Sequence, residues 1–242
     1  MKHLDLKQIA EYVEANVGTF HKKRLESLEN LKLKEILQRK NPYLFKAKNI
    51  LTAQDLVKSI LDAFLQSQEE TMFGDFIEGV AIFVCKQIND AKKSTDLVGI
   101  DLEFERDANY YVIEIKSGPN WGNSSQIKKM LDNFAAARAK LKDKNVVAIN
   151  GCCYGRDNKP HKDEYIKLCG QRFWTFISGD ENLYANIIEP FGHKAHEKNE
   201  TFSVAYAKII NRFTFEFGKD FCDESGEIDW KKLIVFNSGI LK

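Results

Sequence analysis

Two short extended segments next to each other, between helical stretches, limit most strongly how this chain can fold. In GIDLEFER, apolar Leu102 and Phe104 alternate with acidic residues, and NYYVIEIKSG follows after the turn DAN. Alternation with a period of two predicts strands, and so short a turn predicts an antiparallel hairpin. A helical pattern and then a buried strand closed by Gly151 are expected next. The expected order is helix, strand, strand, helix, strand, which indicates an α/β fold.

Helical patterns precede the hairpin. Thr52 is expected to cap a helix over LTAQDLVKSILDAFL, with Asp55 at its third helical position. A second, mostly buried helix is expected over FGDFIEGVAIFVCKQIND, and it carries Glu78. Acidic side chains on this helix therefore precede the hairpin in the chain.

The stretch from Lys22 to Lys48 contains nine Lys or Arg residues and three Glu residues. Its apolar residues recur near helical period, which predicts a helix that Pro42 ends. The basic side chains could lie along nucleic-acid phosphates, or they could form only a solvated helix face. We therefore expect a helical N-terminal region over residues 1–68, as a candidate DNA-binding or dimerisation element, and a core over residues 69–242.

Composition excludes several classes of protein. No apolar run approaches the ~20 residues that span a bilayer, and the charged, amphipathic start differs from a secretory signal. The five cysteines are odd in number and lack C-x-x-C spacing, so we expect reduced core residues. With 36 basic and 35 acidic residues, net charge alone gives little argument for nucleic-acid binding. We expect a cytoplasmic protein without a membrane segment.

Three charged residues on the two expected strands suggest chemistry. Glu114 and Lys116 are two apart and so point to one face, while Ile113 and Ile115 point to the other. Charged side chains are costly to bury in an apolar strand unless they are paired or bind a metal. Asp101 stands thirteen residues before Glu114, so an antiparallel hairpin would bring the two carboxylates together.

Converging carboxylates provide the oxygen ligands that a hard cation such as Mg²⁺ prefers, and such a cation assists phosphodiester hydrolysis. The predicted ligands are Asp101, Glu114 and the backbone carbonyl of Ile115, with Lys116 placed to orient or deprotonate the attacking water. The alternative is that Glu114 and Lys116 form only an outward-facing ion pair on an edge strand, because E-x-K alone is a weak motif.

Four segments together resemble Type II restriction endonucleases of the PD-(D/E)XK superfamily: GIDLEF, VIEIKSGPNWGNSSQIKKM, NVVAINGCCYG and FWTFISGDENLYANIIEP. The resemblance is to the subgroup that cleaves degenerate palindromes with a GG-to-CC core. It spans residues 73–190, and KSGPNWGNSSQ is far more specific than E-x-K. It implies a restriction endonuclease-like core with a mixed central sheet flanked by helices, over residues 69–242.

The resemblance implies a site-specific, Mg²⁺-dependent endodeoxyribonuclease that acts on double-stranded DNA. Asp101 and Glu114 would ligate Mg²⁺, Lys116 would assist the nucleophile, and Glu78 would supply a supporting catalytic carboxylate. Isoleucine stands at position 100 in place of the eponymous proline, which makes Glu103 the next candidate after Asp101.

The loop after Lys116 is rich in turn formers and runs into a helix N-terminus, which favours an anion such as phosphate. The alternatives are helix capping by Asn123 and Ser124 and packing of the loop by Trp121. The predicted DNA contacts are Asn120, Trp121, Asn123, Ser124, Ser125 and Lys128.

A restriction enzyme that reads a palindrome is expected to act as a homodimer, with a cognate DNA methyltransferase as its genetic partner. Two rival hypotheses are a repair or recombination nuclease with the same catalytic residues, and a DNA-binding module whose acidic cluster is only structural. Cleavage of intact linear duplex would separate the first rival from a restriction enzyme, and loss of function in Glu114→Ala would exclude the second.

Overall fold

The structure is a computed structural model that describes residues 4–240. The chain forms two compact units, of which unit 1 is Met1–Gly18 with Phe73–His193 and unit 2 is Thr19–Met72 with Lys194–Lys242. These units differ from the expected contiguous division at residue 68. The physical reason is that one apolar core in unit 2 takes in side chains from both the N-terminal and the C-terminal parts of the chain.

Unit 1 contains a four-stranded sheet in the order β1-β2-β3-β4. Strands β1 and β2 are antiparallel, whereas β2–β3 and β3–β4 are parallel, so the sheet is mixed. The predicted hairpin and the order of the central elements are confirmed. The elements wholly within unit 1 are β1 (Leu102–Arg106), β2 (Asn109–Lys116), α5 (Ser124–Lys140), β3 (Val146–Cys152), β4 (Ile166–Cys169), α6 (Gln171–Ser178), α7 (Leu183–Asn186) and α8 (Ile188–Phe191).

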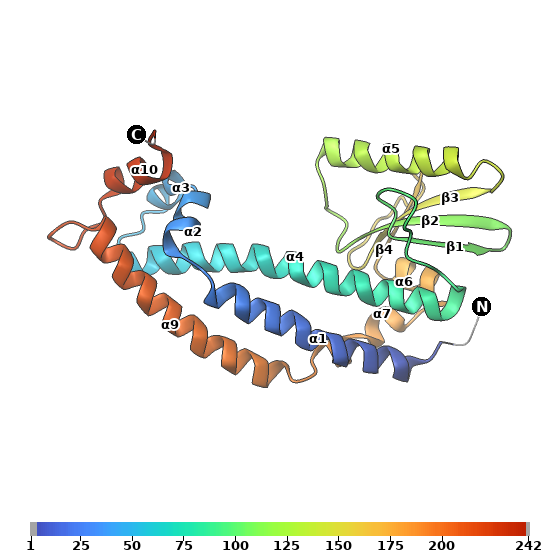
Figure 1. Ribbon diagram of the computed structural model, residues 1–242, viewed down its shortest axis with the longest axis horizontal. Helices are drawn as coiled ribbons and strands as arrows, with labels where there is room; N and C mark the ends of the chain where they lie inside the picture. Colours follow the sequence, from blue (N-terminus) through green and yellow to red (C-terminus); the bar gives the residue numbers. More distant parts are fainter. Residues whose placement is uncertain (1–3, 241–242) are drawn as a thin grey trace. The chain divides into compact units, whose positions relative to one another are not determined.

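Helices cover both faces of this sheet (Figure 1). Ile113 and Ile115 lie on the face that packs with residues of α4 and α6, such as Val80 and Phe173. Val112 lies on the opposite face, in a second cluster with residues of α5 that include Phe134. Side chains alternate along β2 as a strand requires, so Glu114 and Lys116 share the α5 face with Val112.

Helix α4 (Ala53–Asn89) is one helix of 37 residues, where the sequence predicted two. The predicted cap is present, because Thr52 Oγ1 accepts from Asp55 N at 3.1 Å and donates to Asp55 Oδ2 at 2.7 Å. The polar residues 66–70, between the two predicted helices, are Gln, Ser and Glu, and Gln and Glu are good helix formers. Helix α4 therefore continues without interruption to Glu78 and beyond.

Unit 2 is helical in its described residues, with α2 (Leu33–Arg39), α3 (Pro42–Ala47), α9 (Ala195–Phe221) and α10 (Trp230–Ser238). Helix α1 (Leu6–Glu29) contributes its second half. The single helix predicted to end at Pro42 is wrong, because the chain forms three helices there. Proline suits the first turn of a helix, and Asn41 caps α3 by accepting from the N–H groups of Tyr43 and Leu44.

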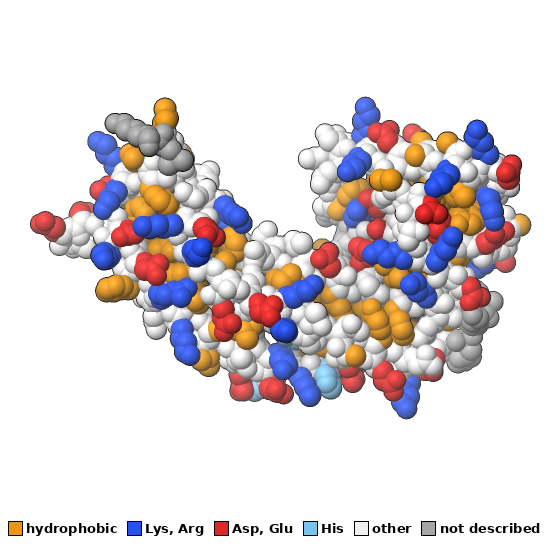
Figure 2. All heavy atoms as spheres, in the orientation of Figure 1, with side chains coloured by type: hydrophobic (Ala, Val, Ile, Leu, Met, Phe, Trp, Pro, Cys, Tyr) orange, Lys and Arg blue, Asp and Glu red, His pale blue; other side chains and the backbone are white. Residues whose placement is uncertain are grey.

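Charge is mixed over the surface. On the face drawn in Figure 2, Lys and Arg side chains are interspersed with Asp and Glu, with no large surface of one sign. In the stretch Lys22–Lys48, several basic groups are paired, as in Lys32 with Glu35 at 3.3 Å and Lys34 with Asp220 at 3.0 Å. Overall charge therefore does not locate the DNA-binding surface. No helix among the described residues is long and apolar enough to cross a membrane.

Candidate active site

The hairpin places Asp101 against the second strand. The two turn residues, Asp107 and Ala108, have φ values of +51° and +59°, as a two-residue hairpin turn requires. Asp101 N donates to Ile113 O at 2.9 Å, and Ile115 N donates to Asp101 Oδ2 at 2.7 Å. The carboxylate of Asp101 is thus held at β2 by a backbone hydrogen bond, one residue before β1 begins.

Glu114 is only 8% exposed, yet one of its carboxylate oxygens has a single partner and the other has none. Oε1 lies 2.7 Å from Lys116 Nζ, whereas Oε2 is buried with no hydrogen-bond partner among the described residues. An unsatisfied buried carboxylate oxygen costs free energy unless something else binds it. Glu114 therefore carries an unused ligand oxygen at the centre of the candidate site.

Lys116 is held from two sides. Its Nζ pairs with Glu114 and lies 4.9 Å from the centre of the Trp121 ring. Trp121 Nε1 in turn donates to Asn150 Oδ1 at 3.0 Å, and Asn150 Nδ2 donates to Glu114 O at 3.3 Å. These contacts form one connected network, in which parallel register sets Asn150 directly beside Glu114.

Asn150 was not expected from the sequence to belong to the site. It is fully buried in β3, within the run VVAING that was taken only as an apolar strand. A lone amide in such a run must find hydrogen-bond partners, and this could have marked it. Trp121 was an expected DNA contact, with packing of the loop as its alternative; in the structure its N–H is used by Asn150 and its ring lies against Lys116.

Glu78 on α4 lies within electrostatic reach of the strand residues. Burial, and then the negative charge of Asp101, raises the pKa of Glu78 to about 7, against the opposing charges of Lys93 and Lys116. Burial also raises the pKa of Asp101, opposed by the Ile115 N–H and by the same two lysines. Electrostatic interactions therefore connect three of the four predicted catalytic residues, Glu78, Asp101 and Lys116. Lys93, which was not expected from the sequence, also acts on Glu78 and Asp101.

The carboxylate oxygens of the site are of the type that Mg²⁺ binds, but they do not by themselves complete its coordination shell. Among residues 4–240, no group of three or more His, Cys, Asp or Glu side chains is arranged to hold a metal ion. Mg²⁺ commonly uses only one or two carboxylates and keeps water and phosphate oxygens as its other ligands. Glu114 Oε2 is unsatisfied, and Asp101 Oδ1 makes no hydrogen bond within the described chain. Two hard oxygen donors are thus available.

The loop after Lys116 presents most of the predicted DNA contacts at the surface. Asn120, Ser124, Ser125 and Lys128 are exposed, and Trp121 is half-buried.

Asn123 is exposed and also caps α5. Its Oδ1 accepts from Ser125 N and Gln126 N at 3.1 Å, and its N–H donates to Gln126 Oε1. Capping by Asn123, the alternative considered from the sequence, is confirmed, while a capping box leaves the outer surface of this turn free for another contact.

A comparison with protein families agrees with this geometry. The family model described as Type II restriction endonuclease EcoO109I matches residues 7–199 of the chain. The chain belongs to this family. A search among curated proteins found no match.

Membership of the EcoO109I family makes the chain a Type II restriction endonuclease, a site-specific hydrolase of double-stranded DNA. The mixed four-stranded sheet flanked by helices is the restriction endonuclease-like core that the sequence predicted. The family match begins at residue 7, well before the Phe73 at which the resemblance in the sequence began. The N-terminal helices are therefore part of what the family shares.

Proposed function

We propose that this chain cleaves DNA with Mg²⁺ through a PD-(D/E)XK centre made of Asp101, Glu114 and Lys116, supported by Glu78. The observation that carries the proposal is the buried, unsatisfied Oε2 of Glu114, beside Lys116, in a chain of the EcoO109I family. A carboxylate oxygen in this state fits a ligand that is cationic. An outward-facing ion pair, the alternative for Glu114 and Lys116, would leave both carboxylate oxygens in water.

The residues around Glu114 explain how the site would work. The Ile115 N–H holds one oxygen of Asp101 and leaves the other free, and Oε2 of Glu114 faces no other protein donor. Asp101, Glu114 and the carbonyl of Ile115 would hold the metal ion. When bound, Mg²⁺ would stabilise the negative charge that develops on the scissile phosphate.

Lys116 would act on the attacking water. The ion pair with Glu114 and the Trp121 ring restrict its long side chain, so that its ammonium is placed before DNA binds. A positioned lysine can orient the water, donate to a phosphate oxygen, or transfer a proton. Glu78, with its pKa raised to about 7, would exchange a proton near neutral pH when no metal ion is bound.

The test is cleavage of phage or plasmid DNA by the purified protein, with Mg²⁺ or with EDTA. We expect discrete bands that require Mg²⁺ and that disappear in Glu114→Ala and Lys116→Met. Lys144→Met is a matched control, because Lys144 pairs with Glu105 at 2.6 Å and lies 4.9 Å from the Tyr110 ring, away from the site. Bands that survive in Lys116→Met as in Lys144→Met would refute the proposed role of Lys116.

The proposal includes the finer features of the resemblance. We infer that the enzyme reads a degenerate palindrome with a GG-to-CC core, acts as a homodimer, and has a cognate methyltransferase that protects cytoplasmic host DNA. Sequencing the ends of the cleavage products tests the palindrome, and sedimentation of the purified chain tests the dimer. Cleavage confined to branched DNA would instead favour a repair or recombination nuclease.

A further inference from the structure

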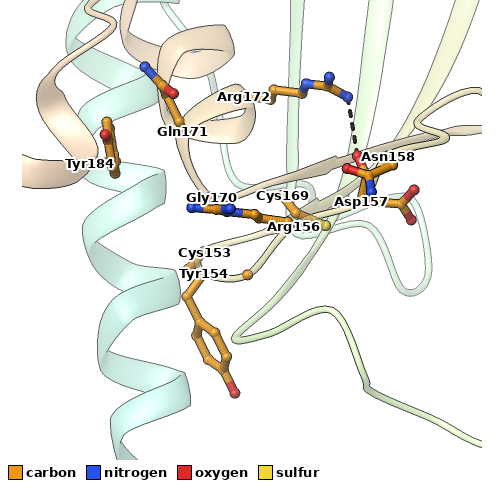
Figure 3. Close-up of a pocket in the computed structure, with 11 residues that line it drawn as sticks. Cys153, Tyr154, Arg156, Asp157, Asn158, Cys169, Gly170, Gln171, Arg172 and Tyr184 are labelled. Carbon is orange, nitrogen blue, oxygen red and sulfur yellow. Dashed lines mark hydrogen bonds between the residues drawn. The ribbon is translucent and has the colours of Figure 1, made fainter.

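A pocket of about 440 Å³ lies at the carboxyl ends of β3 and β4 (Figure 3). One wall is the segment from Cys153 to Asn158 that follows β3, and another runs from Cys169 to Arg172, with Tyr184 at the side. One lining position requires glycine: Gly170 has φ +54°, and a Cβ there would lie 2.6 Å from Gly155 O. None of these residues was singled out as a DNA contact from the sequence.

The pocket is connected to the strand that carries Lys116. Cys153 N donates to Lys116 O, and Tyr154 N donates to Ser117 O, each at 3.0 Å. These bonds continue the pairing of β2 with β3 beyond the ends of both strands. The segment that lines the pocket therefore starts beside the candidate active site.

The pocket carries positive charge that the protein does not use. Arg156 is exposed and has no hydrogen bond or ion pair within the described chain. Arg172 donates one hydrogen bond, from its guanidinium to Asp157 O at 3.2 Å (Figure 3). The carboxylate of Asp157 is already paired, with Lys162 Nζ at 3.0 Å and Lys167 Nζ at 4.0 Å. Two arginines with free donors thus line the pocket, and their side chains extend in different directions in Figure 3.

We propose that Arg156 and Arg172 each bind a backbone phosphate of the DNA near the scissile phosphate. A guanidinium presents a planar set of donors that matches the oxygens of a phosphate, and its charge suits an anion better than the neutral edge of a base. The proposal rests on the proposed function, because it places the scissile phosphate at Lys116. It assigns to this pocket the task of fixing the position of the duplex rather than reading its sequence.

The test measures DNA binding in EDTA, so it is independent of cleavage and of the metal ion. A fluorescent duplex is titrated with the full chain between about 50 and 200 mM salt. Replacing Arg156 with Ala should reduce the slope of log affinity against log salt by about one. At about 0.15 M salt this corresponds to about fivefold weaker binding. Arg172→Ala should act alike, and the double variant should lose about two units of slope.

Two variants control this measurement. Lys142→Ala removes an exposed positive charge that precedes β3, at the end of the strand opposite the pocket, and should leave the slope unchanged. Arg156→Lys keeps the charge and should retain the slope. An unchanged slope in Arg156→Ala would overturn the proposal.

Selective loss of affinity for the cleaved sequence, with nonspecific binding intact, would also overturn it and assign Arg156 to a base edge. Failure of the proposed catalytic centre would be seen separately, as Mg²⁺-dependent cleavage that survives in Glu114→Ala.

Discussion

Replacing Trp121 with Phe removes one hydrogen-bond donor and keeps an aromatic ring beside Lys116. The indole N–H donates to Asn150 Oδ1 at 3.0 Å, and Asn150 is fully buried. Without this donor, Oδ1 would keep only the weak thiol of Cys152 at 3.8 Å. The variant therefore leaves a fully buried amide oxygen with only one weak donor.

The magnitude follows from that burial. A buried polar group that loses its partner costs about 1–3 kcal/mol of unfolding free energy, and we expect about 2 kcal/mol for Trp121→Phe. For a chain of this length, about 2 kcal/mol lowers the Tm by about 4–8 °C.

Trp121→Leu also removes the cation–π contact with Lys116, worth about 1 kcal/mol at a partly exposed site. We expect a lower kcat for Leu than for Phe, by about fivefold, with KM little changed.

The assay is urea or thermal unfolding of Trp121→Phe, Asn150→Leu and the double variant, with cleavage kinetics alongside. Trp230→Phe is the control, because the Trp230 ring also lies near a lysine, Lys46, at 5.2 Å, but its indole N–H makes no hydrogen bond within the described chain. Since removing both partners leaves neither unsatisfied, the double variant should cost less than the two single variants together by about 1 kcal/mol or more. Additive costs would refute the network, and equal kcat values for Phe and Leu would refute the role of the ring.

Three further predictions follow from the site. Mg²⁺ should raise the Tm of the wild-type chain and of Glu105→Gln but not of Glu114→Gln, because a ligand that binds only the folded state stabilises it; an equal rise in Glu114→Gln would contradict metal binding by that residue. Glu78 has a pKa raised from 4.5 to about 7, so it contributes stability below pH 4.5 that is lost as the pH rises through 7. Urea unfolding in EDTA is measured at about pH 5 and about pH 8, near the two ends of this pH range. Between them the unfolding free energy should fall less for Glu78→Gln than for wild type, and an equal fall would contradict the raised pKa. Asn123→Ala should lower the unfolding free energy by about 0.5–2 kcal/mol in calorimetry, because it removes the cap of α5, and no change would show that the cap contributes little.

The central part of the fold could be predicted because its signals are local. Alternation in residues 102–106, the turn at Asp107, and the cap at Asn123 each depend on a few neighbouring residues. The pairing of Asp101 with β2 followed from the same hairpin. A local hydrophobic pattern or a single turn residue is sufficient to predict each of these features.

The rest depended on contacts that are distant in the sequence. Nothing local in FWTFISGD indicates that α6 follows β4, and Arg172 reaches the pocket only because β4 pairs with β3. Asn150 meets Trp121 through parallel pairing, whose register the strand pattern alone does not contain. Two helices were expected on either side of the polar residues before Phe73, yet α4 continues through these residues because Gln and Glu favour a helix.

Two hydrogen bonds of the candidate site differ in how far apart in the sequence their partners are. Asp101 reaches its partner Ile115 across 14 residues of one hairpin, whereas Asn150 bonds to Glu114 across 36 residues. Closing a short local hairpin costs less entropy than docking a strand from further along the chain. During folding, the carboxylates can therefore meet first, and a chain that has not yet added β3 would lack the Asn150 bond that holds the Trp121 ring at Lys116. If Lys116 acts as proposed, we expect hydrolysis to require the completed sheet.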